Sequence, residues 1–394
     1  MGHIWLTLYV LLIVLFKVQS DSTVNITIIE GATATGAVCL DGSPPSYAMD
    51  KGSGPGANNW VIYLEQGGWC TTIEDCARRA KSSGGSSSSS YRNSYSLSGI
   101  LDVNATFNPD FYNWNKVAAL YCDGSSFFGN VDEVDPQNNL HFRGSRIFKA
   151  IIQELAAKGM AYADNILLSG GSAGGLATIL NCDGLRSLVP YAKTVKCLSD
   201  SGFFLHAPNL PGVMHREQYF SDVVQLHGLA NLLPQTCTSR MSPNLCLFPE
   251  YLVEDIKTPL FLLESSFDLF QIQIQYTPYV GGGRHEWFNC VHLSLSFCNS
   301  TQIEKLQEFH TTFVQTLQNL NYSPFRGAFV HNCFRHGHIM TKDGWTCSRV
   351  TVENAVRDWY FDGNNFQYIA TDNLPRNCTS PLDNAFDTKC MKTL

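Results

Sequence analysis

Residues 165–184 read NILLSGGSAGGLATILNCDG, a stretch that predicts a strand, a tight turn and a helix. A strand-like run at residues 166–168 leads to Ser172, and a helix-like apolar run follows it. Glycines at positions 170, 171, 174 and 175 leave room for a strained turn and let neighbouring chain segments approach closely. Because such a turn lifts a serine hydroxyl out of the backbone, Ser172 is a candidate nucleophile whose assignment depends on its partners.

The rest of the chain alternates between strand and helix patterns. Short apolar runs typical of buried strands lie at residues 60–64, 117–121, 166–168, 259–263 and 327–330. Amphipathic helices are expected at residues 142–158 and 301–320, and in the second the apolar side chains recur at three- and four-residue spacing. This alternation predicts an α/β fold with a mostly parallel central sheet flanked by helices. No repeat or linker interrupts it, so we expect a single domain over residues 21–394.

The first 20 residues predict a secretory signal peptide. An apolar run from Ile4 to Phe16 precedes Val18-Gln19-Ser20, which offers small residues at the two positions that a signal peptidase reads. A membrane anchor would need about 20 apolar residues, and this run is shorter. We therefore expect cleavage near Ser20 and a secreted, soluble mature protein without a membrane span.

Cysteines and glycosylation motifs fit the same route. All 14 cysteines follow the predicted signal peptide, which allows up to seven disulfides, and there is no C-x-x-C pair typical of zinc or redox motifs. Five N-x-S/T motifs are candidate glycosylation sites, namely Asn25, Asn104, Asn299, Asn321 and Asn377. The motif at Asn321 is the weakest, because Pro324 follows it directly.

Composition narrows the possible partners. The chain has 394 residues, of which 44% are hydrophobic and 15% charged, and its net charge is −7. It can bury a large core, and no basic cluster indicates a nucleic-acid partner. A polyanionic substrate would have to meet local basic side chains in the cleft. The serine-rich segment 81–99 is expected to be an exposed loop, and we expect a monomer.

A catalytic serine needs a histidine that accepts its proton and a carboxylate that orients this histidine. In α/β-hydrolase folds the chain order is Ser, then Asp or Glu, then His. Asp268 follows the predicted strand at residues 259–263, where an orienting carboxylate would lie, although it could instead cap a following helix. Glu264 and Asp255 are secondary candidates, and Glu264 is expected to lie within the strand.

Three histidines follow the predicted strand at residues 327–330. His331 is expected to belong to the strand, whereas His336 lies deeper in the loop and is favoured as the base, with His338 as its rival. The H-x-H pair could instead suggest a metal. No acidic ligand or H-E-x-x-H pattern accompanies it, so we expect no metal and no organic cofactor.

The segment WVIYLEQGGWC at residues 60–70 offers a cradle for an oxyanion. A buried strand runs into Gly67-Gly68-Trp69, whose backbone N–H groups could face a substrate carbonyl oxygen. The N–H of Ala173, directly after the nucleophile, would be another donor. A tight turn held by a disulfide at Cys70 is compatible with this role. These elements occur in the right order, and we interpret Ser172 as a nucleophile.

Eight longer motifs stand out: GAVCLDGSPPSYAMDKGSG, LEQGGWC, FNPDFYNWNKV, YCDGSSFFG, LHFRGSRIF, LLSGGSAGGL, KCLSDSGFF and CTSR. They resemble the plant pectin acetylesterases, a family related to the animal esterase Notum, from about Val24 to Phe366. The resemblance implies an α/β-hydrolase-like fold and the removal of O-acetyl groups from galacturonan in the cell wall. It places the family's triad at Ser172, Asp268 and His336, and its oxyanion donors at Gly68, Trp69 and Ala173.

The chain also departs from the family's pattern. The family usually has glycine where this chain has Gln66, and cysteines where it has Gly171 and Gly337. Since both cysteines are missing together, we expect that they pair in relatives. Glu264-Ser265-Ser266 replaces a small-residue context before the acid, and His338 has no usual counterpart. These departures predict intact chemistry with an altered pocket shape and pH response.

The combined prediction is a secreted serine carboxylesterase that deacetylates pectin through an acyl-enzyme intermediate. Alternatives are a Notum-like lipid deacylase with a deep apolar pocket, a serine peptidase, and a weakened or non-catalytic wall-binding paralogue. A cleft for pectin should instead be open and offer basic side chains such as Arg143, Arg146 or Arg284.

Overall fold

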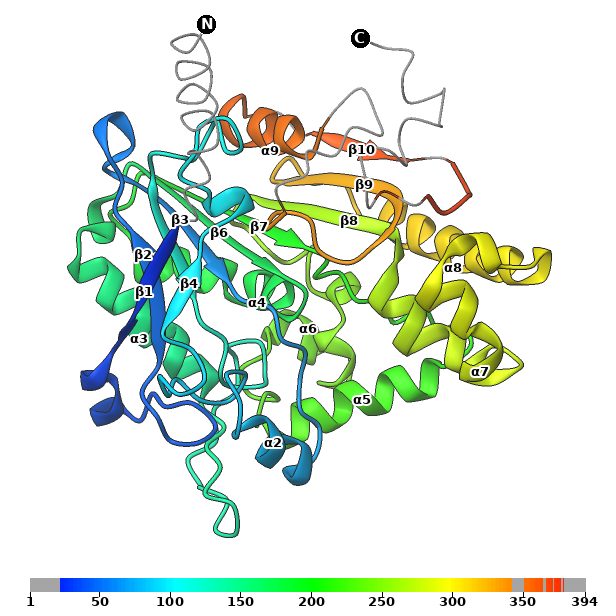
Figure 1. Ribbon diagram of the computed structural model, residues 1–394, viewed down its shortest axis with the longest axis horizontal. Coiled ribbons are helices and arrows are strands. Elements are labelled where there is room, and N and C mark those ends of the chain that lie inside the picture. Colours follow the sequence, from blue (N-terminus) through cyan, green and yellow to red (C-terminus); the bar gives the residue numbers. More distant parts are fainter. Residues whose placement is uncertain (1–21, 342–350, 364–365, 371, 377, 379–394) are drawn as a thin grey trace, which may run out of the picture.

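The computed structural model describes residues 22–341, 351–363, 366–370, 372–376 and 378. Its strands form one ten-stranded sheet (Figure 1). The strands are β1 Thr23–Ile28, β2 Ser46–Asp50, β3 Asn59–Leu64, β4 Ser94–Ser96, β5 Asn115–Ala119, β6 Asn165–Gly171, β7 Thr194–Asp200, β8 Leu260–Asp268, β9 Arg326–Arg335 and β10 Gln367–Ile369. Their order across the sheet is β10-β9-β8-β7-β6-β3-β5-β2-β1-β4.

The sheet is mostly parallel, which confirms the prediction from the sequence. Neighbouring strands from β10 to β5 in this order pair in parallel, whereas β2, β1 and β4 add an antiparallel edge. The carboxyl ends of parallel strands meet at one edge of a sheet, which is where open α/β sheets bind ligands. Residues that end or follow β3, β6, β7, β8 and β9 therefore gather at one edge.

Helices cover both faces of this sheet. They are α2 Ile73–Arg79, α3 Gly144–Ala157, α4 Ala173–Leu188, α5 Val213–Leu226, α6 Gln235–Thr238, α7 Gly283–Phe288, α8 Ser300–Gln318 and α9 Val352–Phe361. The helices α3, α4, α5 and α8 share the larger hydrophobic core with Ile62 of β3, whereas α9 packs on the opposite face with Val61. Successive side chains of β3 thus enter different cores, as expected for a strand buried on both faces.

The five predicted strands correspond to β3, β5, β6, β8 and β9, and the two predicted helices to α3 and α8. Three of these strands, β6, β8 and β9, are several residues longer than predicted. β8 and β9 remain paired up to Asp268 and Arg335, across an irregularity between Ser265 and Phe267. Asp268 is consequently the last residue of β8. The sequence had suggested instead that it lies in a loop beyond the strand.

The serine-rich segment 81–99 is only partly an exposed loop. Residues 88–91 are exposed, but Ser94–Ser96 form β4, which pairs with β1. Ser86 and Leu97 are buried, so both ends of the segment are anchored in the fold. The composition did not predict this strand, because the side chains of the segment show no apolar pattern. Its structure depends instead on pairing with β1, which is distant in the sequence.

Cysteine pairing follows the prediction for an oxidising compartment. Six disulfides join Cys39–Cys122, Cys70–Cys76, Cys182–Cys197, Cys237–Cys246, Cys290–Cys298 and Cys333–Cys378. The other two cysteines, Cys347 and Cys390, lie outside the described residues, as do the predicted signal peptide and Asn377. Of the other glycosylation candidates, Asn25, Asn299 and Asn321 are exposed and Asn104 is half-buried. No helix in the described part of the chain is long and apolar enough to span a bilayer.

Candidate active site

Ser172 occupies the turn between β6 and α4. Its backbone has φ 56° and ψ −121°, a conformation that non-glycine residues rarely adopt and that costs of order 1–3 kcal/mol. The turn is held because its N–H donates to the carbonyl of Asp200 (2.8 Å) and its own carbonyl accepts the N–H of Leu176 (2.9 Å). A Cβ atom on Gly174 would lie 2.1 Å from the carbonyl oxygen of Leu64, so glycine is required for this close approach.

Asp268 and His336 are brought together by the ends of two neighbouring strands. Asp268 ends β8, and His336 directly follows β9. Oδ2 of Asp268 lies 2.7 Å from Nδ1 of His336, while its Oδ1 accepts the N–H of Gln271 at 2.8 Å. One carboxylate oxygen therefore contacts the imidazole, while the other accepts an N–H of the helical segment that follows, so the geometry is compatible with both roles considered from the sequence.

The surroundings of His336 suit a general base. Its Nε2 atom is buried and has no hydrogen-bond partner among the described residues, while the carboxylate at Nδ1 favours the tautomer that leaves a lone pair on Nε2. Burial opposes the charged imidazolium, but the charge of Asp268, its hydrogen bond and the charge of Asp200 outweigh this, and the pKa of His336 is raised above 6.5.

His338 and His331 belong to a different cluster. Asp200 contacts Nδ1 of His338 (2.5 Å), and Nε2 of His338 lies 2.7 Å from Nε2 of His331. The N–H of Cys333 donates to Nδ1 of His331, so this ring must carry its proton on Nε2 and donate it to His338. Burial, then the charges of His338 and Arg335, hold the pKa of His331 well below 6.5. Both ring nitrogens of His338 are thus engaged, which leaves His336 as the histidine that fits a base.

The secondary acid candidates lie elsewhere. Glu264 lies within β8, as expected, and its Oε1 accepts the N–H groups of Gly202 (3.2 Å) and Phe203 (3.1 Å). Asp255 precedes β8 and pairs with Arg240 at 3.1 Å. Among the described contacts, neither carboxylate bonds to an imidazole.

The glycine-rich loop after β3 lies against the start of α4. The indole N–H of Trp69 donates to Oγ of Ser126 (2.8 Å), and this hydroxyl donates to the carbonyl of Ala173 (2.7 Å). Two of the predicted oxyanion donors are therefore neighbours, although they come from different elements. Within the part of the chain that the structure describes, the backbone N–H groups of Gly68, Trp69 and Ala173 bond to no protein acceptor. Their hydrogen-bonding capacity is therefore not used by these residues.

The departures at positions 66, 171 and 337 meet in space. A Cβ atom on Gly171 would lie 3.6 Å from Oε1 of Gln66, and one on Gly337 would lie 3.8 Å from the same oxygen. The residue before Ser172 and the residue after His336 are thus both next to one side chain, which brings the two loops together. Positions 171 and 337 therefore both border Gln66, and the pairing of cysteines at these positions in relatives stays a prediction.

The arginines considered for the cleft are engaged elsewhere. Arg146 pairs with Asp132 and donates to Asn130 (2.7 Å), and Arg143 donates to the carbonyls of Val131 (3.2 Å) and Asp132 (2.7 Å). Both therefore stabilise the segment around residues 130–132. The side chain of Arg284 is outside the described part of the chain.

A strained serine between strand and helix and a histidine–carboxylate pair, all at the carboxyl edge of a mostly parallel sheet, define an α/β-hydrolase-like fold. The pectinacetylesterase family pattern matches residues 17–381, and the chain belongs to this family of carboxylic ester hydrolases.

Comparison with individual proteins agrees with this family. The chain is 41% identical over 380 residues to pectin acetylesterase 7 of Arabidopsis thaliana, covering 95% of each chain. It is 30% identical over 346 residues to palmitoleoyl-protein carboxylesterase NOTUM of Drosophila melanogaster, covering 82% of this chain and 47% of that protein. The solved structure of the Wnt deacylase Notum from Drosophila aligns with a TM-score of 0.75 and 24% identity, covering 90% of this chain and 97% of that one. This last likeness shows the shared fold.

Three residues of the site were not singled out from the sequence. Asp200 bonds to the loop after His336, and Arg79 and Tyr121 bond to the loop that carries Gly68. Asp200 had a signal, since it lies within the segment KCLSDSGFF and ends β7 just as Asp268 ends β8. The other two act through contacts with backbone carbonyls, which no local pattern of the sequence reveals.

Proposed function

We propose that the protein is a secreted serine carboxylesterase that removes O-acetyl groups from pectin, with Ser172 as nucleophile, His336 as general base and Asp268 as its orienting acid. The observation that carries the proposal is that Asp268 holds Nδ1 of His336 while Nε2 has no partner among the described residues. An imidazole held in this way can accept a proton from a serine hydroxyl.

The reaction would proceed in two halves. Oγ of Ser172 attacks the acetyl carbonyl as its proton moves to Nε2 of His336, and the backbone N–H groups of Gly68, Trp69 and Ala173 stabilise the oxyanion. His336 then protonates the departing sugar hydroxyl, which leaves an acetyl-serine. Water gives its proton to His336 and attacks the acetyl group, and release of acetate returns the proton to Ser172. Protein groups and water suffice for every step.

The substrate class rests on the relatives. The chain is 41% and 40% identical to two Arabidopsis pectin acetylesterases over nearly its whole length. Secretion is supported by the apolar run at the N-terminus and by the six disulfides, since such bonds persist in oxidising compartments.

The direct test is acetate release from acetylated pectin by the wild type and by Ser172→Ala. Alanine keeps the Cβ atom, so the variant should fold normally and lose hydrolysis while still binding the polymer. Ser187→Ala is the matched control, because Ser187 is an exposed serine at the far end of the same helix. Hydrolysis by Ser172→Ala at the wild-type rate would refute the proposal.

The alternative is a Notum-like lipid deacylase, which the shared fold keeps in consideration. The two activities differ in the acyl chain that they release. Initial rates on 4-nitrophenyl esters from acetate to octanoate separate them, since a pectin acetylesterase should prefer acetate and a lipid deacylase the longer chains. A preference for octanoate would transfer the assignment to the alternative.

A further inference from the structure

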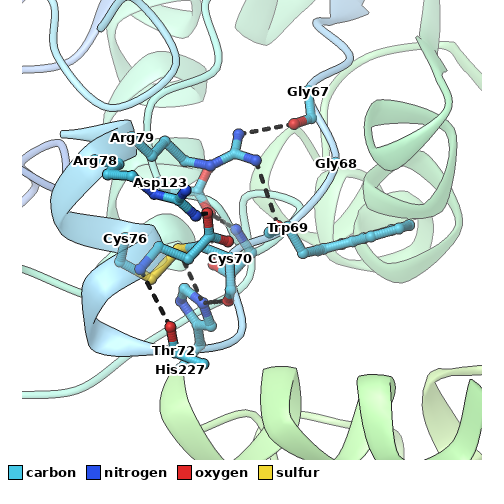
Figure 2. The surroundings of a disulfide bond; sticks show 12 residues. Gly67, Gly68, Trp69, Cys70, Thr72, Cys76, Arg78, Arg79, Asp123 and His227 are labelled. Atoms are coloured by element: carbon cyan, nitrogen blue, oxygen red, sulfur yellow. Dashed lines mark hydrogen bonds and ion pairs between the residues drawn. A yellow bond between two sulfur atoms is a disulfide. The ribbon is translucent and has the colours of Figure 1, made fainter. Parts of the chain in front are cut away.

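Two side chains hold the carbonyl groups of the glycine-rich loop. The guanidinium of Arg79, at the end of α2, donates from Nη1 to the carbonyl of Gly67 (2.7 Å) and from Nη2 to that of Trp69 (3.3 Å) (Figure 2). The hydroxyl of Tyr121 donates to the carbonyl between them, that of Gly68 (2.7 Å). Three successive carbonyls are therefore fixed by partners outside the loop.

The direction of the Tyr121 proton follows from its partners. The backbone N–H of Ser126 can only donate, so the Tyr121 oxygen accepts this bond (2.8 Å). Its single proton must then point to the carbonyl of Gly68, which can only accept. Burial raises the pKa of Tyr121 well above its ordinary value, which keeps this proton in place.

The carbonyl directions fix the N–H directions. In a trans peptide the C=O of one residue and the N–H of the next point in opposite directions, and the described residues contain no cis peptide bond. Holding the carbonyl of Gly67 therefore aims the N–H of Gly68 away from Arg79. Holding the carbonyl of Gly68 aims the N–H of Trp69 away from Tyr121. These are the two N–H groups that bond to no acceptor among the described residues.

We propose that Arg79 and Tyr121 are positioning residues that aim the N–H groups of Gly68 and Trp69 at the oxyanion of the reacting ester. The proposal rests on the proposed function, because it assumes that these N–H groups are the oxyanion donors. A preorganised donor acts on the transition state more than on the bound substrate, so the two side chains should affect kcat and leave KM nearly unchanged.

The fold fixes Arg79 in this position. The Cys70–Cys76 disulfide joins the residue after Trp69 to the middle of α2, only three residues before Arg79 (Figure 2). Thr72 caps the helix by accepting the N–H of Asp75 (3.2 Å). Tyr121 is fixed by its ring, because a Cβ atom on Gly67 would lie 2.2 Å from the ring. The loop is thus held between one helix and one aromatic ring.

The deciding variant is Tyr121→Phe, which removes one oxygen atom and keeps the ring that packs on Gly67. Arg79→Ala removes the other anchor, and Arg79→Lys restores a donor for one carbonyl. On 4-nitrophenyl acetate we expect kcat to fall about 10- to 100-fold for Tyr121→Phe and for Arg79→Ala, while KM stays within about twofold of the wild-type value. This decrease in kcat is at most as large as the decrease caused by removing a whole oxyanion donor. Arg79→Lys should lie between Arg79→Ala and the wild type.

Matched controls and a second measurement exclude a merely structural effect. Tyr47→Phe removes a hydroxyl that donates to the half-buried Glu154, and Arg78→Ala removes the exposed neighbour of Arg79, so both should keep wild-type kcat. Phenylboronic acid forms a tetrahedral anionic adduct with a catalytic serine, and its affinity should fall in proportion to kcat only for the positioning variants. Folded Tyr121→Phe with wild-type kcat, or with reduced kcat and unchanged boronate affinity, would overturn the proposal. If Ser172→Ala remains active, the proposed function itself fails, whatever the result for Tyr121.

Discussion

Asp200 and His338 are joined twice, since one carboxylate oxygen of Asp200 contacts Nδ1 of the ring (2.5 Å) and the other accepts the backbone N–H of His338 (2.6 Å). The second oxygen also accepts the N–H of Ile339 (2.9 Å), and the carbonyl of Asp200 accepts the N–H of Ser172 (2.8 Å). One residue at the end of β7 thus connects the turn of Ser172 with the loop that follows His336.

We therefore predict that Asp200→Asn lowers kcat on 4-nitrophenyl acetate about 10- to 100-fold while the protein remains folded. Asparagine has only one acceptor oxygen, so its amide nitrogen must face either Nδ1 of His338 or the backbone N–H groups of His338 and Ile339. The loop after His336 should therefore shift, and a small displacement of a catalytic group is costly. Asp183→Asn is the matched control, because Asp183 also accepts backbone N–H groups, those of Lys257 and Thr258, away from the site. Equal kcat for Asp200→Asn and the wild type would contradict the prediction.

Asp268→Asn should lower kcat by about three to four orders of magnitude. An asparagine can present its amide N–H to Nδ1 and stabilise the tautomer in which Nε2 carries the proton, which prevents His336 from acting as a base. Steady-state kinetics on a small acetyl ester measure the effect, and circular dichroism verifies the fold. Asp255→Asn serves as the control, since this other candidate acid pairs with Arg240. A larger loss for Asp255→Asn than for Asp268→Asn would reverse the assignment.

The activity should rise with pH through a midpoint above 6.5. His336 must be neutral to accept a proton, and the charges of Asp268 and Asp200 with the hydrogen bond of Asp268 raise its pKa against the effect of burial. Below this pKa the imidazolium form predominates and the rate falls. The profile of kcat/KM should be measured on a neutral acetyl ester, because the carboxyl groups of pectin titrate themselves. A flat profile from pH 4 to 8 would argue against His336 as the base.

The sequence predicted those parts of the site that lie within one local pattern. Ser172 is predicted because strand, glycines and helix are contiguous, and Asp268 and His336 because each follows an apolar run. β7 was missed since Lys196 interrupts its apolar character. The side chain of Lys196 donates to the carbonyls of Trp359 (3.2 Å) and Tyr360 (2.6 Å), so a charged residue is accommodated in a strand by partners far away in the sequence.

Residues that act through distant partners could not be predicted in this way. Asp200 becomes a candidate only after the strand before it is recognised. Tyr121 lies 53 residues from the carbonyl of Gly68 that it holds, and nothing near it in the sequence indicates this partner. The exact ends of β8 and β9 depend on pairing between the two strands, which the composition of either one does not contain.

Stability should depend on pH through Glu264, which is fully buried in β8. Burial, then the charges of Asp268 and Asp200, raise the pKa of Glu264 well above 4.5, so the folded protein keeps this carboxyl protonated where the unfolded chain ionises it. Its contribution to stability is complete below pH 4.5 and is lost as the pH rises toward the folded-state pKa.

Glu264→Gln imitates the protonated form. The free energy of unfolding of the variant relative to the wild type should therefore increase from pH 4 to 7, by at most about 1.4 kcal/mol per pH unit. Urea unfolding at several pH values measures this difference, with Glu304→Gln on the exposed face of α8 as a control for the loss of one carboxylate. A difference that stays constant over this range would mean that Glu264 is ionised in the folded protein.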